Sequence, residues 1–185
     1  MRKHAHSRAD ITLDTILEIH AEIFKEAWPE IAGNYRIAPV EITNSKHLPP
    51  HHTAVPGLML ELGKELEARL QTLERAEGMV SKVMDTSDER FGTILRLLQI
   101  AAWLHHKITH IHPFSDGNGR TARLAANLIL ERYGLVGLSI KVERENKDRY
   151  RAALAQMDLH SDDGPLLDLM VEGIIERYSG VPKKI

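Results

Sequence analysis

The chain has 185 residues, of which 43% are hydrophobic and 27% charged, with a net charge of −2 and no cysteine. This length suits one domain with a real core, and the composition is that of a folded globular protein, not a disordered tail. The near-neutral charge gives no bulk attraction to nucleic acid or membranes, and the lack of cysteine excludes disulfides, thiolate catalysis and zinc–thiolate sites. No apolar run reaches membrane-spanning length and no signal core is present, so we expect a soluble cytoplasmic protein with neither nucleic-acid nor membrane partners.

The N-terminal part of the chain predicts one amphipathic helix. Apolar side chains between residues 13 and 24 recur at helical spacing. Asp10 or Thr12 can serve as the N-cap of this helix, and Pro29 lies beyond its C-terminal end.

Residues 36–56 have a different character, because they show no helical periodicity. Residues 40–43 alternate between apolar and polar side chains as in a short β-strand, and residues 44–45 are turn formers. Residues 47–55 contain two prolines and three histidines, which suits an exposed edge with poor pairing. We therefore predict a short β-hairpin over about residues 36–56.

Helical patterns occupy most of the remaining chain, at residues 57–77, 89–110, 119–133, 146–157 and 165–178. The helix at 89–110 is apolar on most sides in its second half, so we expect it to be buried at the centre of the fold. Four leucines at four-residue spacing mark the core face of the first helix in this series: Leu58, Leu62, Leu66 and Leu70. The sequence thus predicts one all-α domain over residues 1–185, with about seven to eight helices and the β-hairpin.

The most informative stretch is residues 112–123, which read His-Pro-Phe-Ser-Asp-Gly-Asn-Gly-Arg-Thr-Ala-Arg. It lies between two helices that we expect to be buried. A Gly-Asn-Gly turn that opens a helix is a good anion site, because backbone N–H groups converge there and the first N–H groups of the helix have no partner. Arg120 and Arg123 fall on one face of the first turns, where both can bind further phosphate oxygens.

Two further residues, Asp116 and His112, indicate which kind of reaction this anion site supports. Asp116 has no place among phosphates unless a cation lies between them, which indicates Mg²⁺ held by one carboxylate and by phosphate oxygens. His112, at the other end of the loop, is free to take a proton from an incoming hydroxyl. The combination indicates transfer of a phosphate ester.

The sequence also contains eleven histidines, which raises the possibility of a metal site. His106 and His110 lie four residues apart on one helix face, and His51 and His52 can add ligands from the hairpin. No zincin pattern accompanies them. We therefore interpret the helical pair as partly buried polar residues whose partners are neighbouring backbone groups.

The motif fills every position of the Fic signature, His112-x-Phe114-x-Asp116-Gly117-Asn118-Gly119-Arg120-x-x-Arg123, and the chain resembles the Fic family along nearly its whole length. Leu104-His105 and Ile108 resemble the family's pattern ahead of the motif. Gly33-x-Tyr35-Arg36 and Pro49-Pro50 resemble the entry to and exit from its flap. Typical members transfer AMP from ATP to protein hydroxyls.

The resemblance implies a role for each residue of the motif. His112 is the general base for a Tyr, Thr or Ser hydroxyl of the target, and Asp116 holds the Mg²⁺ that bridges the α- and β-phosphates of ATP. The backbone N–H groups of Gly117 to Gly119, with the Asn118 side chain, stabilise the transition state. Arg120 and Arg123 bind the outer phosphates, and Phe114 anchors the loop in the core.

The resemblance also implies two protein partners. In the family the flap pairs with an extended segment of the target protein, which here assigns target binding to His47, Pro49, Pro50, His51, His52 and Thr53. Many members are inhibited by a glutamate that pairs with the second arginine of the motif, here Arg123. The Ser139–Glu143 and Asp168–Gly173 segments match the inhibitory pattern only in part, which leaves two possibilities: a separate antitoxin protein supplies the glutamate, or the domain is poorly active without its target. Of the two we expect the antitoxin, as in a toxin–antitoxin pair.

Two alternatives to AMP transfer stay open. The same site can take another donor, giving transfer of UMP, phosphocholine or phosphate, or it can remove AMP; the intact Gly-Asn-Gly-Arg disfavours the phosphate case. A non-catalytic module that binds nucleotide or a partner is disfavoured by the presence of both His112 and Asp116, which binding alone does not need.

Overall fold

The computed structural model describes residues 10–43, 45, 47–80, 87–135, 137–138 and 145–179. The described residues form six α-helices and two short 3₁₀-helices, which confirms the all-helical class with a slightly smaller number of helices than expected. In chain order these are α2 (Leu13–Phe24), η1 (Pro29–Ile31), η2 (His52–Ala54), α3 (Val55–Val80), α4 (Ser87–Ile111), α5 (Asn118–Arg132), α6 (Glu145–His160) and α7 (Gly164–Ser179). None of the helices in these ranges is both long and apolar enough to cross a membrane.

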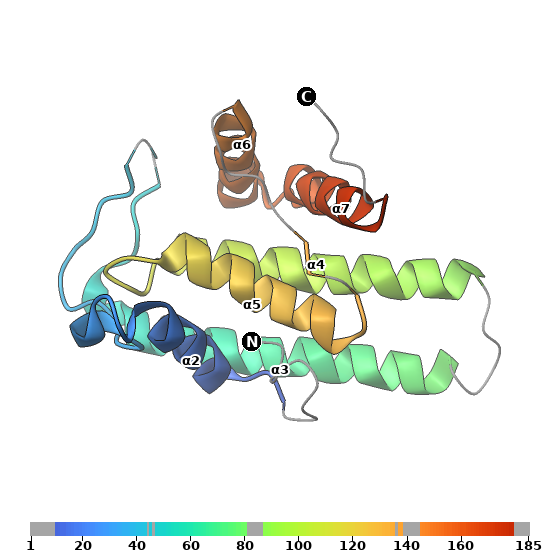
Figure 1. Ribbon diagram of the computed structural model, residues 1–185, viewed down its shortest axis with the longest axis horizontal. Helices are drawn as coiled ribbons and strands as arrows, with labels where there is room; N and C mark the ends of the chain where they lie inside the picture. The colour runs from blue at the N-terminus through green and yellow to red at the C-terminus, as the bar shows by residue number, and fades with distance from the viewer. Residues whose placement is uncertain are drawn as a thin grey trace.

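Helix α4 lies at the centre of the fold, as its apolar composition predicts. It packs along α5 on one side and α3 on another, and α6 and α7 lie over it (Figure 1). Alanines on α4 and α5 permit this close approach, and all of them are at most 1% exposed: Ala101, Ala102, Ala122, Ala125 and Ala126.

Helices α2 and α3 cover the opposite side of the bundle. Thr12 is the N-cap of α2, and its backbone N–H donates to Thr15 Oγ1 at 3.1 Å. On α3, Leu62, Leu66 and Leu70 are buried and Leu58 is partly buried, which confirms the predicted leucine row.

The predicted β-hairpin is wrong for the described part of residues 36–56, which contains no β-strand. Up to the start of η2 at His52, the described residues instead form two arms without regular secondary structure at one end of the bundle (Figure 1). Arg36 joins the arms, because its Nη1 donates to the Ala38 carbonyl at 3.1 Å and its Nη2 donates to the Pro50 carbonyl at 2.5 Å. Pro49 and Pro50 have no N–H to donate to a strand ladder, so one arm cannot pair regularly and a side chain takes the place of the ladder.

Candidate functional site

The motif forms a loop between the end of α4 and the start of α5. At the end of α4, the His112 N–H still donates to the Ile108 carbonyl at 3.0 Å, and the chain then turns away through a φ of +51° at His112. Arg36 holds this turn from outside, because its Nε donates to the His112 carbonyl at 2.7 Å and its N–H donates to the Pro113 carbonyl at 2.9 Å. The backbone that carries the expected base is therefore fixed by a buried arginine from the segment that precedes η2.

The His112 side chain has the tautomer that a base needs. Its Nδ1 lies 3.3 Å from the Thr109 carbonyl, which can only accept, so Nδ1 carries the proton and Nε2 keeps a free lone pair. Partial burial lowers the pKa of His112, against the opposing effect of the Thr109 contact. The ring is therefore neutral at pH 7 and able to accept a proton.

Asn118 closes the loop from within. Its Nδ2 donates to the Phe114 carbonyl at 2.8 Å, and its Oδ1 accepts from the Phe114 N–H at 2.9 Å. The residue is only 2% exposed. Both polar atoms of the side chain are thus engaged with the loop backbone. This corrects the expectation that the Asn118 side chain faces a phosphate, and it makes Asn118 a positioning residue.

His20 of α2 supports the loop from below, and the sequence analysis missed this role. The fully buried Phe114 ring confirms the expected anchor and stacks on the His20 ring at 3.7 Å between centroids. His20 Nδ1 accepts from the Gly33 N–H at 3.0 Å, so Nε2 carries the proton and donates to the Asp116 carbonyl at 3.1 Å. The available signal was a histidine at a position of α2 where the helical spacing requires an apolar residue.

Gly117 is the N-cap of α5 and cannot be another residue without strain. Its φ is +76°, and a Cβ at this position would lie 2.4 Å from Phe24 Cε2. The first N–H to bond back within the helix is that of Thr121, to the Gly117 carbonyl at 2.9 Å. The N–H groups of Asn118, Gly119 and Arg120 therefore have no acceptor within the helix, which is the anion site that the sequence predicts.

Asp116 and Arg120 lie at the exposed mouth of this site. The Asp116 Oδ1 accepts from the Gly117 N–H at 2.5 Å, and its Oδ2 accepts from Arg120 Nη2 at 3.1 Å. The guanidinium also lies 4.7 Å from the centre of the Phe24 ring. The two side chains are 58% and 49% exposed, so their ion pair contributes little stability and opens readily for a ligand.

Arg123 lies deeper, between α5 and α6. A Cβ on Gly119 would lie 3.4 Å from Arg123 Nη1, which places the guanidinium beside the start of α5. On its other side, Tyr150 Oη lies 3.2 Å from His105 Nε2. Burial raises the pKa of Tyr150 to about 12 against the opposing effect of Arg123, and burial with the help of Arg123 lowers the pKa of His105 to about 3. Arg123 is thus the only charged member of this group at neutral pH.

The residues expected to bind a target differ in the contacts that hold them. His47 and Pro50 attach the segment to the helical bundle, since His47 Nε2 lies 2.8 Å from the His110 carbonyl and Pro50 accepts from Arg36. His51 is the N-cap of η2 and its Nδ1 lies 2.9 Å from Thr53 Oγ1. The remaining two members are Pro49, partly buried in the extended arm, and His52, which begins η2.

Two apolar side chains of this segment were missed by the sequence analysis. Ile37 is 89% exposed and Leu48 is 83% exposed. The available signal was an isolated apolar residue in an otherwise polar, proline-rich stretch. Both residues flank the arms that Arg36 joins, so they present apolar surface where the target is expected.

His106 and His110 have a different partner from the one expected. His106 Nε2 lies 2.8 Å and His110 Nδ1 lies 2.7 Å from the same oxygen, Asp158 Oδ1 of α6. The interpretation that neighbouring backbone satisfies their rings is therefore wrong. The partner is a carboxylate 48 and 52 residues further along the chain, and helical spacing carries no information about it.

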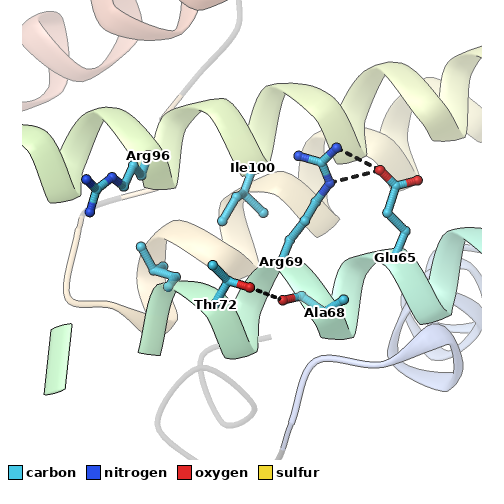
Figure 2. A pocket seen from close by; sticks show the side chains of 7 residues that line it. Glu65, Ala68, Arg69, Thr72, Arg96 and Ile100 are labelled. Carbon is cyan, nitrogen blue, oxygen red and sulfur yellow. Dashed lines mark hydrogen bonds and ion pairs between the residues drawn. The ribbon is translucent and has the colours of Figure 1, made fainter. Parts of the chain in front are cut away.

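A cavity of about 610 Å³ lies between α3 and α4, away from the loop (Figure 2). One of its lining residues is Arg69, whose Nη2 and Nε donate to Glu65 Oε1 at 2.7 and 3.0 Å. The Arg69 guanidinium also lies 4.4 Å from the centre of the Trp103 ring. Because this guanidinium is already engaged on two sides and none of the lining residues belongs to the motif, we assign the cavity no part in the chemistry.

Comparison with known proteins places the geometry in context. The Fic/DOC family model matches residues 10–130. The chain is 34% identical to protein adenylyltransferase Fic of Nematostella vectensis over 157 residues, which cover 85% of this chain and 31% of that protein. It is 30% identical to protein adenylyltransferase fic-1 of Caenorhabditis elegans over 177 residues, covering 94% and 30%. The chain thus spans about a third of the length of these curated relatives.

Solved structures show the same arrangement of helices. Fic-1 of C. elegans superimposes with a TM-score of 0.67 at 28% identity, over 97% of this chain and 45% of that one. BepC of Bartonella tribocorum, whose crystal structure contains AMPPNP, gives a TM-score of 0.58 at 17% identity, over 92% and 80%. The second likeness concerns the fold alone.

Proposed function

Because this chain belongs to the Fic/DOC family, we propose that it transfers AMP from ATP to a Tyr, Thr or Ser hydroxyl of a target protein and releases pyrophosphate. The observation that carries the proposal is the contact between His112 Nδ1 and the Thr109 carbonyl. It leaves Nε2 as a proton acceptor at one end of a loop whose other end is an unpaired helix N-terminus.

His112 acts first. Its Nε2 takes the proton of the target hydroxyl while the oxygen forms a bond to the α-phosphorus of ATP. The bond from that phosphorus to the oxygen bridging to the β-phosphate breaks, and pyrophosphate leaves with this oxygen. A positioned base of this kind contributes about 10²–10⁴-fold to the rate.

The start of α5 stabilises the charge that develops on the α-phosphate. The donors are the backbone N–H groups of Asn118, Gly119 and Arg120, which have no acceptor within the helix. Loss of one such donor typically costs about 10²–10³-fold in rate. Arg120 and Arg123 bind the outer phosphates from one face of the first turns of α5, Arg120 at the exposed mouth and the partly buried Arg123 deeper in the site.

Asp116 suits a Mg²⁺ ion that arrives with the nucleotide. Its carboxylate supplies oxygen ligands, is more than half exposed, and pairs only weakly with the exposed Arg120. When bound, the ion neutralises charge on the leaving pyrophosphate. In this proposal Asp116 would be its protein ligand.

The segment between Arg36 and Thr53 serves as the target-binding flap. Its extended arms leave backbone groups for an extended segment of the target, which positions the acceptor hydroxyl through main-chain hydrogen bonds. Exposed Ile37 and Leu48 add apolar contact. Changing both to serine should raise the KM for the target protein and leave ATP binding unchanged.

We propose further that a separate small antitoxin protein supplies an inhibitory glutamate to Arg123. Within the described residues the nearest match to the inhibitory pattern has Glu172 at the glutamate position, and this residue pairs with Arg149 at 2.9 Å. The Ser139–Glu143 match lies outside the described residues. A co-purified small protein that suppresses AMP transfer, and does so only when its glutamate is intact, supports this regulation; full activity and no toxicity of the protein expressed alone refutes it.

One labelling experiment tests the activity. The protein is incubated in lysate with Mg²⁺ and with ATP radioactive at either the α- or the γ-phosphate, beside His112→Ala and a matched control, His160→Ala, at an exposed position on α6. Label from the α-phosphate alone, lost only in His112→Ala, supports AMP transfer. Label from the γ-phosphate indicates a kinase, and no label indicates a binding module, a donor other than ATP or removal of AMP; either result refutes the proposal.

A further inference from the structure

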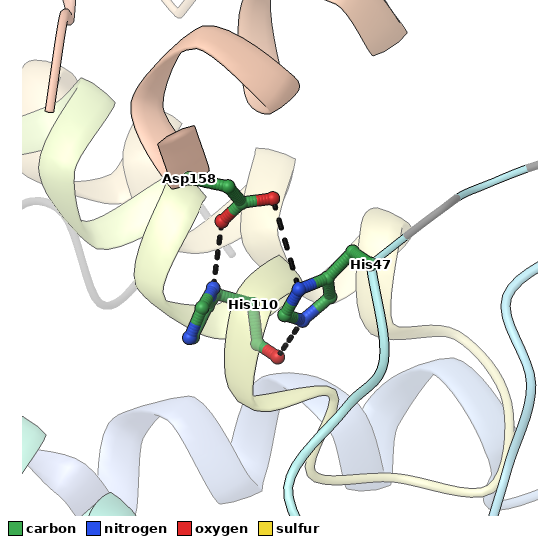
Figure 3. Close-up of side chains that lie close together, drawn as sticks. All are labelled: His47, His110 and Asp158. Atoms are coloured by element: carbon green, nitrogen blue, oxygen red, sulfur yellow. Dashed lines mark hydrogen bonds and ion pairs between the residues drawn. The ribbon is translucent and has the colours of Figure 1, made fainter. Parts of the chain in front are cut away.

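Three histidines surround Asp158 at the junction of the flap, α4 and α6. His106 and His110 come from α4. Figure 3 shows His110 with His47, which comes from the flap, and Asp158, which comes from α6. His110 Nδ1 lies 2.7 Å from Asp158 Oδ1, and His47 Nδ1 lies 3.8 Å from Asp158 Oδ2. One ligand atom from each of His47, His110 and Asp158 lies within 4.8 Å of the other two.

In one contact of this cluster, neither of the two facing polar atoms carries a hydrogen. His47 Nε2 lies 2.8 Å from the His110 carbonyl. Because a carbonyl can only accept, Nε2 carries the proton, and a neutral His47 ring then has a lone pair on Nδ1. That lone pair faces Asp158 Oδ2, which is also an acceptor. Two acceptors that face each other across 3.8 Å leave a position suited to a cation.

We propose that His47 Nδ1, His110 Nδ1 and Asp158 Oδ2 bind a divalent transition-metal ion, with Zn²⁺ as the preferred member of this class. Two imidazoles and one carboxylate are a usual ligand set for Zn²⁺ with one position left for water. Bond lengths of about 2.0–2.2 Å in a tetrahedral site place neighbouring ligand atoms about 3.4 Å apart. The three groups here lie within 4.8 Å of one another, so a bound ion would draw them together by small side-chain movements. On binding, the His110 proton moves from Nδ1 to Nε2, so the ring stays neutral.

The surrounding contacts support this role. His106 Nε2 donates to Asp158 Oδ1 and leaves Oδ2 directed at His47, as expected of a residue that orients a metal-binding carboxylate. The His106 and His110 bonds keep the pKa of Asp158 below its usual value, although burial acts in the opposite direction. The carboxylate is therefore ionised at neutral pH.

The proposed metal site joins the flap and α4, on which AMP transfer depends. Its ligands take no part in the transfer itself. It would attach the flap, through His47, to the last turn of α4, two residues before His112. This ion is distinct from the Mg²⁺ proposed at Asp116, since the ligands are mainly nitrogen and none is shared. The inference does not depend on AMP transfer, because it concerns only the attachment of the flap to the bundle.

The test measures binding of the metal alone to tag-free protein that has been freed of metal with a chelator. Calorimetric titration with Zn²⁺ should show a single tight site, which Mg²⁺ at millimolar concentration does not occupy. Titration with Co²⁺ should give the intense visible bands of a four-coordinate site. His47→Ala and Asp158→Asn should each weaken Zn²⁺ binding by at least about 100-fold.

Two control variants make the result specific. His160→Ala removes an exposed histidine near the end of the same helix as Asp158, and Asp116→Ala removes the proposed Mg²⁺ ligand. Both should bind Zn²⁺ as the parent does, and far-ultraviolet circular dichroism checks that every variant is folded. Absence of a tight site, or equal binding by the parent and His47→Ala, overturns the proposal. An equal loss in His160→Ala also overturns it, because binding would then be non-specific.

Discussion

Replacing Gly117 by alanine tests how closely α2 supports the catalytic loop. A Cβ at Gly117 would lie 2.4 Å from Phe24 Cε2 and 2.9 Å from Cζ, far inside the ordinary contact distance of about 3.5–4.0 Å. The left-handed φ of +76° adds a cost of about 1–2 kcal/mol for any residue with a Cβ. Overpacking in a well-filled core typically costs a further 1–3 kcal/mol, roughly. The sum, about 2–5 kcal/mol, is below the stability of a typical domain, so the variant should still fold.

A double-mutant cycle separates the two costs. Phe24→Leu removes the ring atoms that the new Cβ would meet but leaves φ unchanged. In urea unfolding, the double variant should therefore be more stable than the sum of the single effects by about 1–3 kcal/mol. Gly57→Ala is the matched control, because its Cβ would meet nothing within 4 Å, and it should be neutral or stabilising by up to about 1 kcal/mol.

The same variants connect packing with activity. Displacing the loop by about 1 Å can cost on the order of 10²-fold in rate. We therefore expect Gly117→Ala to lower AMP transfer by about that factor, while Gly57→Ala retains it. If Gly117→Ala changes the free energy of unfolding by less than about 0.5 kcal/mol, or if its effect is additive with Phe24→Leu, then Phe24 does not limit this position and the steric reasoning fails.

Three further predictions follow from the contacts around the loop. Arg36→Lys keeps the charge but loses the planar guanidinium that bonds three carbonyls, so the free energy of unfolding should fall by about 2–4 kcal/mol. Arg149→Lys, at an exposed position, should change the free energy of unfolding by less than about 0.5 kcal/mol. Asn118→Asp cannot donate to the Phe114 carbonyl and should cost about 1–3 kcal/mol in urea unfolding together with most of the activity; an unchanged midpoint contradicts the positioning role. Because the pKa of His105 falls to about 3 in the folded state, its contribution to stability is complete above pH 6.5 and decreases by up to about 1.4 kcal/mol per unit as the pH falls toward 3. A folded His105→Gln variant should show a flatter pH profile than the parent, and parallel profiles refute this assignment.

The parts of the fold that depend on neighbouring residues could be predicted from the sequence. The spacing of apolar residues placed α2 and α5 within a residue or two of their bounds, because helical periodicity and the turn residues at the ends are local properties. The burial of Phe114 was expected from the resemblance to the Fic family, and the structure confirms it. The loop between α4 and α5 was placed correctly, since the Gly-Asn-Gly sequence at residues 117–119 is a local turn signal.

The parts that depend on distant partners could not be predicted. Alternating side chains at residues 40–43 indicate an extended backbone but not a partner strand, and here the Thr43 carbonyl accepts from a distant side chain, Arg151 Nη2 of α6, at 3.3 Å. The role of His20 could not be predicted, because its bonds to Gly33 and Asp116 join segments that are far apart in the sequence. The role of Asn118 was misassigned since its motif position is compatible with both loop closure and phosphate contact, and only the coordinates distinguish them.

The φ of +51° at His112 has a consequence for how this site can be used. Residues other than glycine seldom adopt that conformation spontaneously, and here Arg36 from one region and His20 from another fix the loop on both sides. A synthetic peptide with the sequence of residues 112–123 would carry every functional group of the motif and yet sample the required shape only rarely. Grafting the twelve residues onto another scaffold would therefore fail unless both supporting side chains were transplanted with them.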